Sequence, residues 1–163
     1  MAEGRWTAYL AAAAVIGLDR VSKWMIERWV PASAGYRIIP GFFDIVHSEN
    51  RGAAFGIFND STFEWRSLAL VVVSVAAVIF ISVYLWRARH IETAMRWGMA
   101  LILGGAAGNA IDRIVSGRVT DFLEFYIGDY HWPTFNVADS AIVIGCGLLL
   151  LDMLRSKQAA NVS

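Results

Sequence analysis

Long runs of apolar residues without charge alternate with polar stretches along this chain. Three runs carry no charged side chain: Ser67–Trp86, Trp97–Ile111 and Ser140–Leu151. A helix of about 20 residues crosses a ~30 Å hydrocarbon core, so the first run is long enough and the other two need their polar flanks. A fourth segment, Trp6–Trp29, becomes charged after Leu18. The pattern predicts four transmembrane helices, at about residues 6–29, 66–86, 96–113 and 138–155.

Positive charges indicate which ends of these helices face the cytoplasm. The short connection Arg87–Arg96 contains three arginines, and Arg155 and Lys157 follow the last apolar run. Because basic residues concentrate in short cytoplasmic loops, this connection and both termini are expected in the cytoplasm. Arg28 and Arg66, at outer helix ends, count against this orientation. We therefore expect one membrane-embedded domain over residues 1–163, with a cytoplasmic connection at about 87–95 and outer connections at about 30–65 and 114–137.

Composition supports a membrane protein and argues against several kinds of partner and site. Hydrophobic residues make up 57% of the chain, against roughly 45–50% in average globular domains. The net charge of zero gives no indication of nucleic-acid binding. The single cysteine, Cys146, excludes an internal disulfide, and the amino end lacks a small-residue cleavage motif, so the first helix is expected to stay uncleaved. Six tryptophans lie at or near predicted helix ends, where amphipathic rings favour the membrane interface: Trp6, Trp29, Trp65, Trp86, Trp97 and Trp132.

The first outer connection has the composition of short β-strands. Tyr36–His47 is rich in Ile, Val and Phe and is interrupted by Pro40 and Gly41, which favours strands joined by a turn. Asn50–Gly52 then predicts a turn into a second strand, Ala53–Phe58. We expect a small sheet on the outer membrane surface, although a loop that only packs on the helices is an equal alternative. Four aromatic residues are placed in the headgroup region by this interpretation: Phe42, Phe43, Phe55 and Phe58.

Polar residues inside the predicted helices fall at one level. With a rise of about 1.5 Å per residue from the cytoplasmic end of each helix, Asp19 and Lys23 lie ~20–25 Å up the first helix. Asn109 and Asp112 lie ~20–24 Å up the third helix, and Asp139 lies ~23 Å up the fourth. A level shared by three helices predicts a single polar site near the outer boundary of the membrane.

Each of these polar groups also has a structural explanation. Asp19 and Lys23 are four positions apart on one helix face, which favours an ion pair that fixes helix packing over a direct chemical role. Gly104 and Gly108 form a small-xxx-small pair that allows another helix to approach closely. The same segment presents a polar stripe at helical spacing, made of Gly105, Asn109 and either Asp112 or Arg113. For Asn109 and Arg113, positioning of acidic residues and contact with a substrate both stay open.

Two aspartates, Asp121 and Asp139, are the candidates for catalysis. Asp121 lies in the last outer connection, and Asp139 lies just before the last apolar run. The chain has no His-Glu-x-x-His segment and no Gly-x-Ser-x-Gly elbow, which argues against a zinc protease and a serine hydrolase. Two carboxyl groups that share a proton can serve as base and acid when water attacks an amide. The alternative is that Asp121 is an ordinary loop residue and that Asp139 or Asn136 caps the last helix.

The positions of the two aspartates also predict how the pair titrates. Asp139 falls in the first turn of the last helix, where the helix dipole favours a negative charge by roughly 0.3–1 kcal/mol. Because the two groups titrate as a coupled system, we expect Asp139 to be the more acidic partner. Asp121 is then expected to carry the shared proton more often.

Five segments in order form a specific pattern: Leu18–Lys23, Asn50–Gly56, Gly104–Arg113, Gly117–Phe122 and Phe135–Ser140. This combination resembles bacterial lipoprotein signal peptidase (signal peptidase II), with Thr120 as a conservative departure. The resemblance implies an intramembrane aspartic peptidase whose catalytic dyad is Asp121 and Asp139. The implied fold is an all-α polytopic membrane protein with four transmembrane helices, and with a small β-sheet and a short helix on the outer membrane surface. The residues implied to bind substrate or support the site are Asp19, Lys23, Asn50, Gly52, Asn109, Asp112, Arg113, Asn136 and Ala138.

The same resemblance implies a substrate and a location. The substrate is a prolipoprotein with a diacylglyceryl cysteine, cut on the amino side of that cysteine to release the signal peptide, without a metal or organic cofactor. The enzyme is expected as a monomer in the bacterial cytoplasmic (inner) membrane, in contact with phospholipid, with its active site near the outer leaflet and no nucleic-acid partner. Two other classes are a transporter or channel subunit, in which the acids relay protons, and a structural scaffold, in which Asp121 tolerates replacement. Acids confined to one level leave the inner half of the membrane apolar, which argues against a path across it.

Overall fold

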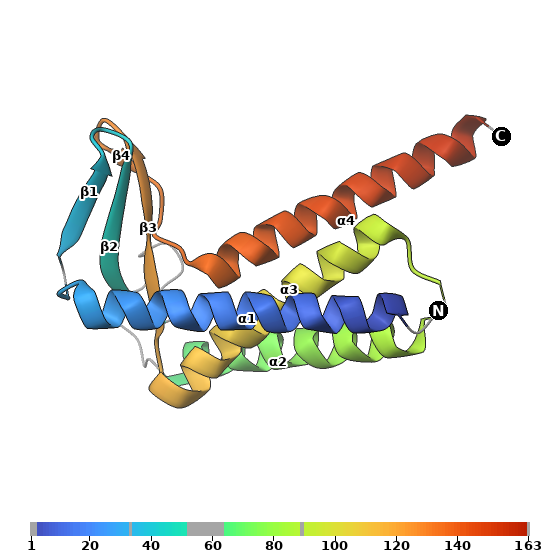
Figure 1. Ribbon diagram of the computed structural model, residues 1–163, viewed down its shortest axis with the longest axis horizontal. Helices are drawn as coiled ribbons and strands as arrows, with labels where there is room; N and C mark the ends of the chain where they lie inside the picture. Colours follow the sequence, from blue (N-terminus) through green and yellow to red (C-terminus); the bar gives the residue numbers. More distant parts are fainter. Residues whose placement is uncertain (1–2, 33, 52–63, 89, 163) are drawn as a thin grey trace.

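Four helices and a small antiparallel sheet make up the described part of the chain. The computed structural model describes residues 3–32, 34–51, 64–88 and 90–162. The helices extend away from the sheet, which lies at one end of the molecule, and both chain termini lie at the other end (Figure 1). The predicted set of four helices is confirmed, and the third and fourth run past their predicted ends. The helices are α1 (Glu3–Trp29), α2 (Glu64–Arg87), α3 (Thr93–Ser116) and α4 (Val137–Val162).

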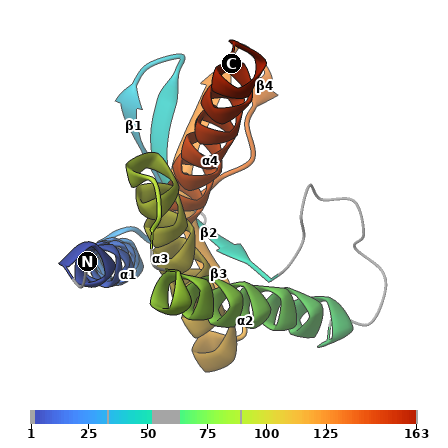
Figure 2. The same cartoon turned by 90° about the vertical axis from the view of Figure 1, so that its right-hand side faces the viewer.

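Helix α3 is the centre of the bundle because the other three helices all pack against it (Figure 2). Its glycines allow this close approach. A Cβ atom on Gly104 would lie 2.7 Å from the carbonyl oxygen of Ala12, and one on Gly108 would lie 2.8 Å from a carboxylate oxygen of Asp19. The predicted close packing at these two glycines is therefore confirmed, and the partner is α1. The apolar core between α1, α2 and α3 contains Ala8, Ala12, Ile81, Leu85, Met99, Ala100 and Leu103.

The sheet has the strand order β1–β2–β3–β4, and neighbouring strands are antiparallel. The strands are β1 (Gly35–Ile39), β2 (Phe43–Asn50), β3 (Val119–Ile127) and β4 (Tyr130–His131). The first two confirm the strands predicted on either side of Pro40 and Gly41, and Gly41 takes a φ of +79° in the turn between them. The loop alternative for this segment is therefore wrong.

Strand β3 lies in the last outer connection, for which the sequence analysis predicted no particular strand. Its sequence is rich in β-branched and aromatic residues, which suit a pleated, half-buried surface. Phe122 packs in an apolar cluster with Ile26 and Val30 at the carboxyl end of α1. The strand thus joins the sheet to the bundle.

Two expectations for the outer connections lie outside the described residues, and a third has no counterpart within them. The turn through Gly52 and the strand Ala53–Phe58, with Phe55 and Phe58, lie outside them. No helix is found in the described parts of the outer connections, residues 30–32, 34–51 and 117–136, where the predicted short outer helix has no counterpart.

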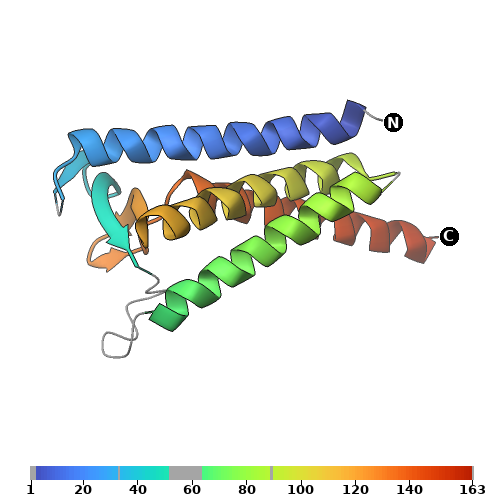
Figure 3. The same ribbon diagram turned by 90° about the horizontal axis from the view of Figure 1, so that it is seen from below.

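Within the part of the chain that the structure describes, two helices are long and apolar enough to cross a membrane, at Ser67–Arg87 in α2 and Val137–Arg155 in α4. Helices α1 and α3 carry more charge, and their membrane crossing stays a prediction. Asp19 and Lys23 of α1 and Asp112 of α3 are nevertheless buried inside the bundle. All four helices run between the sheet end and the terminal end of the molecule, with α2 oblique to α1 (Figure 3). Several tryptophans near helix ends are exposed, as expected at a membrane interface: Trp6, Trp29, Trp86, Trp97 and Trp132.

Candidate active site

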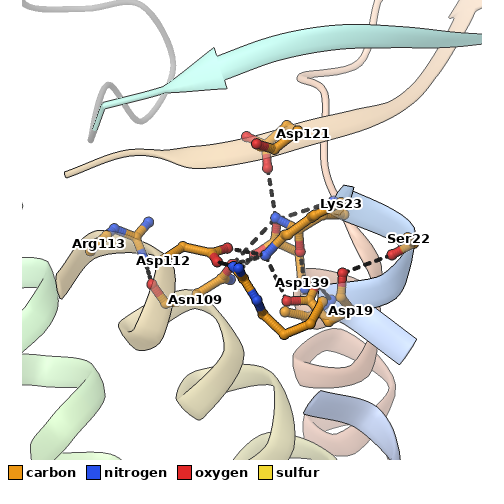
Figure 4. Close-up of polar contacts among 12 residues, drawn as sticks. Asp19, Ser22, Lys23, Asn109, Asp112, Arg113, Asp121 and Asp139 are labelled. Atoms are coloured by element: carbon orange, nitrogen blue, oxygen red, sulfur yellow. Dashed lines mark hydrogen bonds and ion pairs between the residues drawn. The ribbon is translucent and has the colours of Figure 1, made fainter. Parts of the chain in front are cut away.

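Hydrogen bonds and ion pairs connect polar residues of α1, α3 and the start of α4 with Asp121 of β3 (Figure 4). We call this group the polar cluster; it consists of Asp19, Lys23, Asn109, Asp112, Asp121, Asn136 and Asp139. Six of these residues are at most 5% exposed, and Asp139 is half-buried. They come from α1, α3, β3 and the start of α4. The structure therefore brings together residues that are up to 120 positions apart in the sequence (139 minus 19).

Lys23 holds the ionic part of the polar cluster together. Its ammonium nitrogen donates hydrogen bonds to Asp19 Oδ2 at 2.7 Å, to Asn109 Oδ1 at 3.1 Å and to Asp112 Oδ2. These three acceptors match the three donors of an ammonium group. Arg20 binds the other carboxylate oxygen of Asp112. The predicted Asp19–Lys23 ion pair is confirmed, and it extends to a third charge that links α1 to α3.

Two asparagines connect this ionic group to the candidate catalytic aspartates. Because the carbonyl oxygen of Asn109 faces Lys23, its amide nitrogen faces Asp139 and donates to Asp139 Oδ1 at 2.7 Å. The amide nitrogen of Asn136 donates to Asp121 Oδ1 at 2.7 Å and to Asn109 Oδ1 at 3.3 Å. Each aspartate thus receives a hydrogen bond from an asparagine whose own orientation is fixed by other partners.

Asn136 also caps α4 together with Asp139. Its Oδ1 accepts a hydrogen bond from the backbone N–H of Asp139 at 2.9 Å, and Asp139 Oδ2 accepts one from the backbone N–H of Asn136 at 3.3 Å. This reciprocal arrangement is a capping box. Asp19 Oδ1 accepts a third bond, from the backbone N–H of Ala138 at 3.0 Å. The prediction that Asp139 or Asn136 caps the last helix is therefore confirmed. The cap uses Oδ2 of Asp139, and Oδ1 of the same carboxyl group binds Asn109.

Asp121 lies in β3, opposite Ser48 of β2, so the interpretation as a loop residue is wrong. Asn50 Nδ2 donates to Asp121 Oδ2 at 3.0 Å, on the oxygen that Asn136 does not bind. Burial raises the pKa of the Asp121 carboxyl to about 6, against the opposing hydrogen bond from Asn50, and the negative charge of Asp139 adds to the rise. Asp121 therefore holds a proton at higher pH than an ordinary aspartate, in the direction expected for the partner that carries the shared proton.

The remaining predicted site residues lie around this pair. Arg113 follows Asn109 by one helical turn, donates to the Asn109 carbonyl oxygen at 3.3 Å and interacts electrostatically with Asp139 and Asp121. Ala138 is fully buried in the first turn of α4. Gly52 lies outside the described residues. Within the described ranges, no group of three or more His, Cys, Asp and Glu side chains has the arrangement of a metal site.

Three residues beside the polar cluster were missed by sequence reasoning. Arg20 binds Asp112, and Thr120 Oγ1 donates a hydrogen bond to Glu27 Oε1 at 2.6 Å. Arg20 and Glu27 share a helix face with Lys23 by their spacing of three and four positions, which could have indicated them. No local signal marks Thr120, because its partner lies 93 residues away in the sequence.

Known proteins with similar sequences and folds agree on one family. The family profile described as signal peptidase (SPase) II matches residues 11–155. The chain is 62% identical to the lipoprotein signal peptidase of Solibacter usitatus over 164 residues, which cover 100% of both chains. It is 45% identical to the lipoprotein signal peptidase of Nitratidesulfovibrio vulgaris over 144 residues, which cover 88% of this chain and 87% of that one.

The fold is similar to those of bacterial membrane enzymes determined by the in meso method. One has a TM-score of 0.80 and 29% identity and covers 93% of this chain and 89% of its own. Another has a TM-score of 0.78 and 30% identity and covers 91% of this chain and 92% of its own. Because the matching profile runs from α1 to α4 and contains every residue of the polar cluster, the chain belongs to the signal peptidase II family of membrane peptidases, which remove signal peptides from lipoproteins.

Proposed function

We propose that this protein is an aspartic endopeptidase that cuts diacylglyceryl-modified prolipoproteins on the amino side of the lipidated cysteine. The observation that supports this proposal best is the bridge made by Asn136. The side-chain amide nitrogen of Asn136 donates a hydrogen bond to Asp121. Its side-chain oxygen accepts one from the backbone N–H of Asp139, and its own backbone N–H donates one to the Asp139 carboxyl group. Two carboxyl groups from separate elements are thereby held on either side of one residue. An acid and a base that act on the same peptide bond must be held close together in this way.

The two aspartates take different roles because their surroundings differ. Asp139 lies in the first turn of α4, is half-buried, and accepts hydrogen bonds from the side chain of Asn109 and the backbone N–H of Asn136. It acts as the base that removes a proton from water as the water attacks the amide carbonyl. Asp121, whose pKa burial raises to about 6, holds the proton and delivers it to the departing nitrogen.

The neighbouring residues hold this pair in place and take no covalent part. Asn109 and Asn136 present amide nitrogens to the two carboxyl groups, so neither aspartate can turn away without losing a hydrogen bond. Arg113, which interacts electrostatically with both aspartates, supplies positive charge where the attacked carbonyl oxygen becomes negative. The ionic group around Lys23 fixes the helices that carry Asn109 and Asp139.

The position of the polar cluster fits a substrate that stays in the membrane. The polar cluster includes Asp121 of β3, and the sheet lies at the end of the molecule away from both termini (Figure 1). We propose four membrane-spanning helices with both termini in the cytoplasm, so that the cluster faces the outer leaflet of the cytoplasmic membrane. The lipid chains of the precursor can then remain among phospholipids while the scissile bond reaches the aspartates. A monomer provides every group of this site.

The test uses purified protein in phospholipid vesicles and a synthetic precursor peptide with a diacylglyceryl cysteine, beside its unlipidated twin. We expect cleavage of the lipidated peptide only, immediately before the cysteine. Asp121→Asn and Asp139→Asn should each abolish cleavage while the protein stays folded and inserted, and Asp129→Asn, at an exposed turn, should cleave normally. Turnover by either dyad variant, or equal cleavage of both peptides, contradicts the proposal.

A further inference from the structure

Helix α1 contacts the candidate active site through one row of side chains. Asp19, Lys23 and Glu27 follow one another at intervals of four positions, so they share a helix face. Asp19 binds the backbone at the start of α4, and Lys23 turns Asn109 toward Asp139. The first two members of the row therefore hold the Asp139 half of the dyad. Among the described residues, the third member, Glu27, makes no ion pair, and its role needs another explanation.

Glu27 binds the residue directly before Asp121. Its Oε1 accepts a hydrogen bond of 2.6 Å from the hydroxyl group of Thr120. Thr120 is only 4% exposed, and a buried hydroxyl group needs an acceptor inside the protein. This bond is therefore a firm link between α1 and β3.

The alternating directions of the side chains along β3 explain how this link affects Asp121. Successive side chains of a strand point to opposite faces. Thr120 and Phe122 face α1, where they meet Glu27 and an apolar cluster. Asp121, between them, faces the other way and binds Asn136. Helix α1 thus contacts β3 at both positions that flank Asp121, on the face opposite the Asp121 side chain.

We infer that Glu27 is a positioning residue for Asp121, acting through Thr120 and the backbone of β3. This inference rests on the proposed function. The action is mechanical, because Glu27 binds Thr120, whereas the hydrogen bonds to the Asp121 carboxyl come from Asn50 and Asn136. What matters at position 27 is consequently an oxygen that accepts the Thr120 hydroxyl, and the negative charge itself is dispensable.

The test measures kcat and KM on the diacylglyceryl-cysteine peptide for variants of both partners. Glu27→Ala and Thr120→Val should each lower kcat about tenfold, equivalent to about 1.4 kcal/mol in the activation barrier, with KM within about twofold of the wild type. The double variant should fall no further, because one bond is lost in each case. Glu27→Gln and Thr120→Ser keep an acceptor and a donor and should restore kcat. Glu92→Ala, an exposed charge at the start of α3, is the control for removal of a carboxylate.

A second measurement does not depend on turnover. The infrared titration of the Asp121 carboxyl, identified by its loss in Asp121→Asn, should move to higher pH in Glu27→Ala, because a displaced strand weakens the hydrogen bonds that keep the pKa down while burial persists. Unchanged kcat and titration, multiplied losses in the double variant, or a Glu27→Gln variant as poor as Glu27→Ala would overturn the inference. If the wild type does not cut the lipidated peptide, the proposed function fails, and the titration alone decides the positioning role.

Discussion

Replacing Asp121 by asparagine should make the protein more stable at neutral and alkaline pH while abolishing its activity. Asp121 is 1% exposed, and burial raises its pKa from 3.8 to about 6. A difference of this size between folded and unfolded protein corresponds to about 3 kcal/mol. Since the folded state binds the proton more tightly, this stabilisation is complete below pH 3.8 and is lost as pH rises through about 6. Above that value the folded protein carries a buried, ionised carboxyl group at full cost.

Asparagine removes this cost because its amide does not ionise. It also loses part of the hydrogen bonding, since Asn50 and Asn136 both donate to Asp121 and an amide oxygen can replace only one of the two carboxylate oxygens. With about 1 kcal/mol for the lost bond, the net gain for Asp121→Asn at pH 8 is about 2 kcal/mol. At pH 4 the same variant should be about 1 kcal/mol less stable than the wild type.

The assay is equilibrium unfolding in mixed micelles at a series of pH values, with tryptophan fluorescence as the signal. Asp129→Asn, which removes an exposed carboxyl group, is the matched control and should follow the wild type at every pH. The decisive quantity is the difference in unfolding free energy between variant and wild type as pH changes. A difference that stays constant from pH 4 to pH 8, or an Asp121→Asn variant that is destabilised at pH 8, would refute the reasoning.

Two further predictions concern the helix bundle. Lys23→Met should lower the free energy of unfolding by about 3–5 kcal/mol, because it leaves Asp19 and Asp112 buried without their shared cation; the same unfolding assay checks this, and a loss below about 1 kcal/mol contradicts it. Gly104→Val should cost about 1–3 kcal/mol by overpacking, since even a Cβ atom there would touch α1, whereas Gly17→Ala, with nothing within 4 Å, should be neutral or stabilising. Equal thermal stability of the two glycine variants would show that close helix approach is unimportant.

The sequence predicts the helical half of the site well for a physical reason. The rise of a helix is fixed, so the depth of Asp19, Lys23 and Asn109 can be counted from the helix ends. The Asp19–Lys23 pair follows from spacing alone. Its extension to Asp112 does not, because that contact depends on how α1 and α3 rotate about their axes when they pack.

The strand half of the site was harder to predict. The segment Val119–Ile127 contains Asp121 and Glu124 among its aromatic residues, and these charges obscure the strand pattern. Its partner, β2, lies some 70 residues earlier in the chain, as the pairing of Ser48 with Asp121 shows (121 minus 48 is 73). Strand pairings between residues so far apart in the sequence produce no local pattern that a single sequence reveals. The contact between Glu27 and Thr120 was missed for the same reason, since it depends on where β3 crosses α1.

The two aspartates belong to different layers of the molecule. Asp139 is fixed to the helix bundle by the first turn of α4, whereas Asp121 belongs to the sheet, which joins the bundle at the carboxyl end of α1. Any tilt of the sheet relative to the helices therefore changes the gap between the carboxyl groups. In the proposed mechanism, a ligand that wedges the two layers apart would therefore stop cleavage without touching either aspartate.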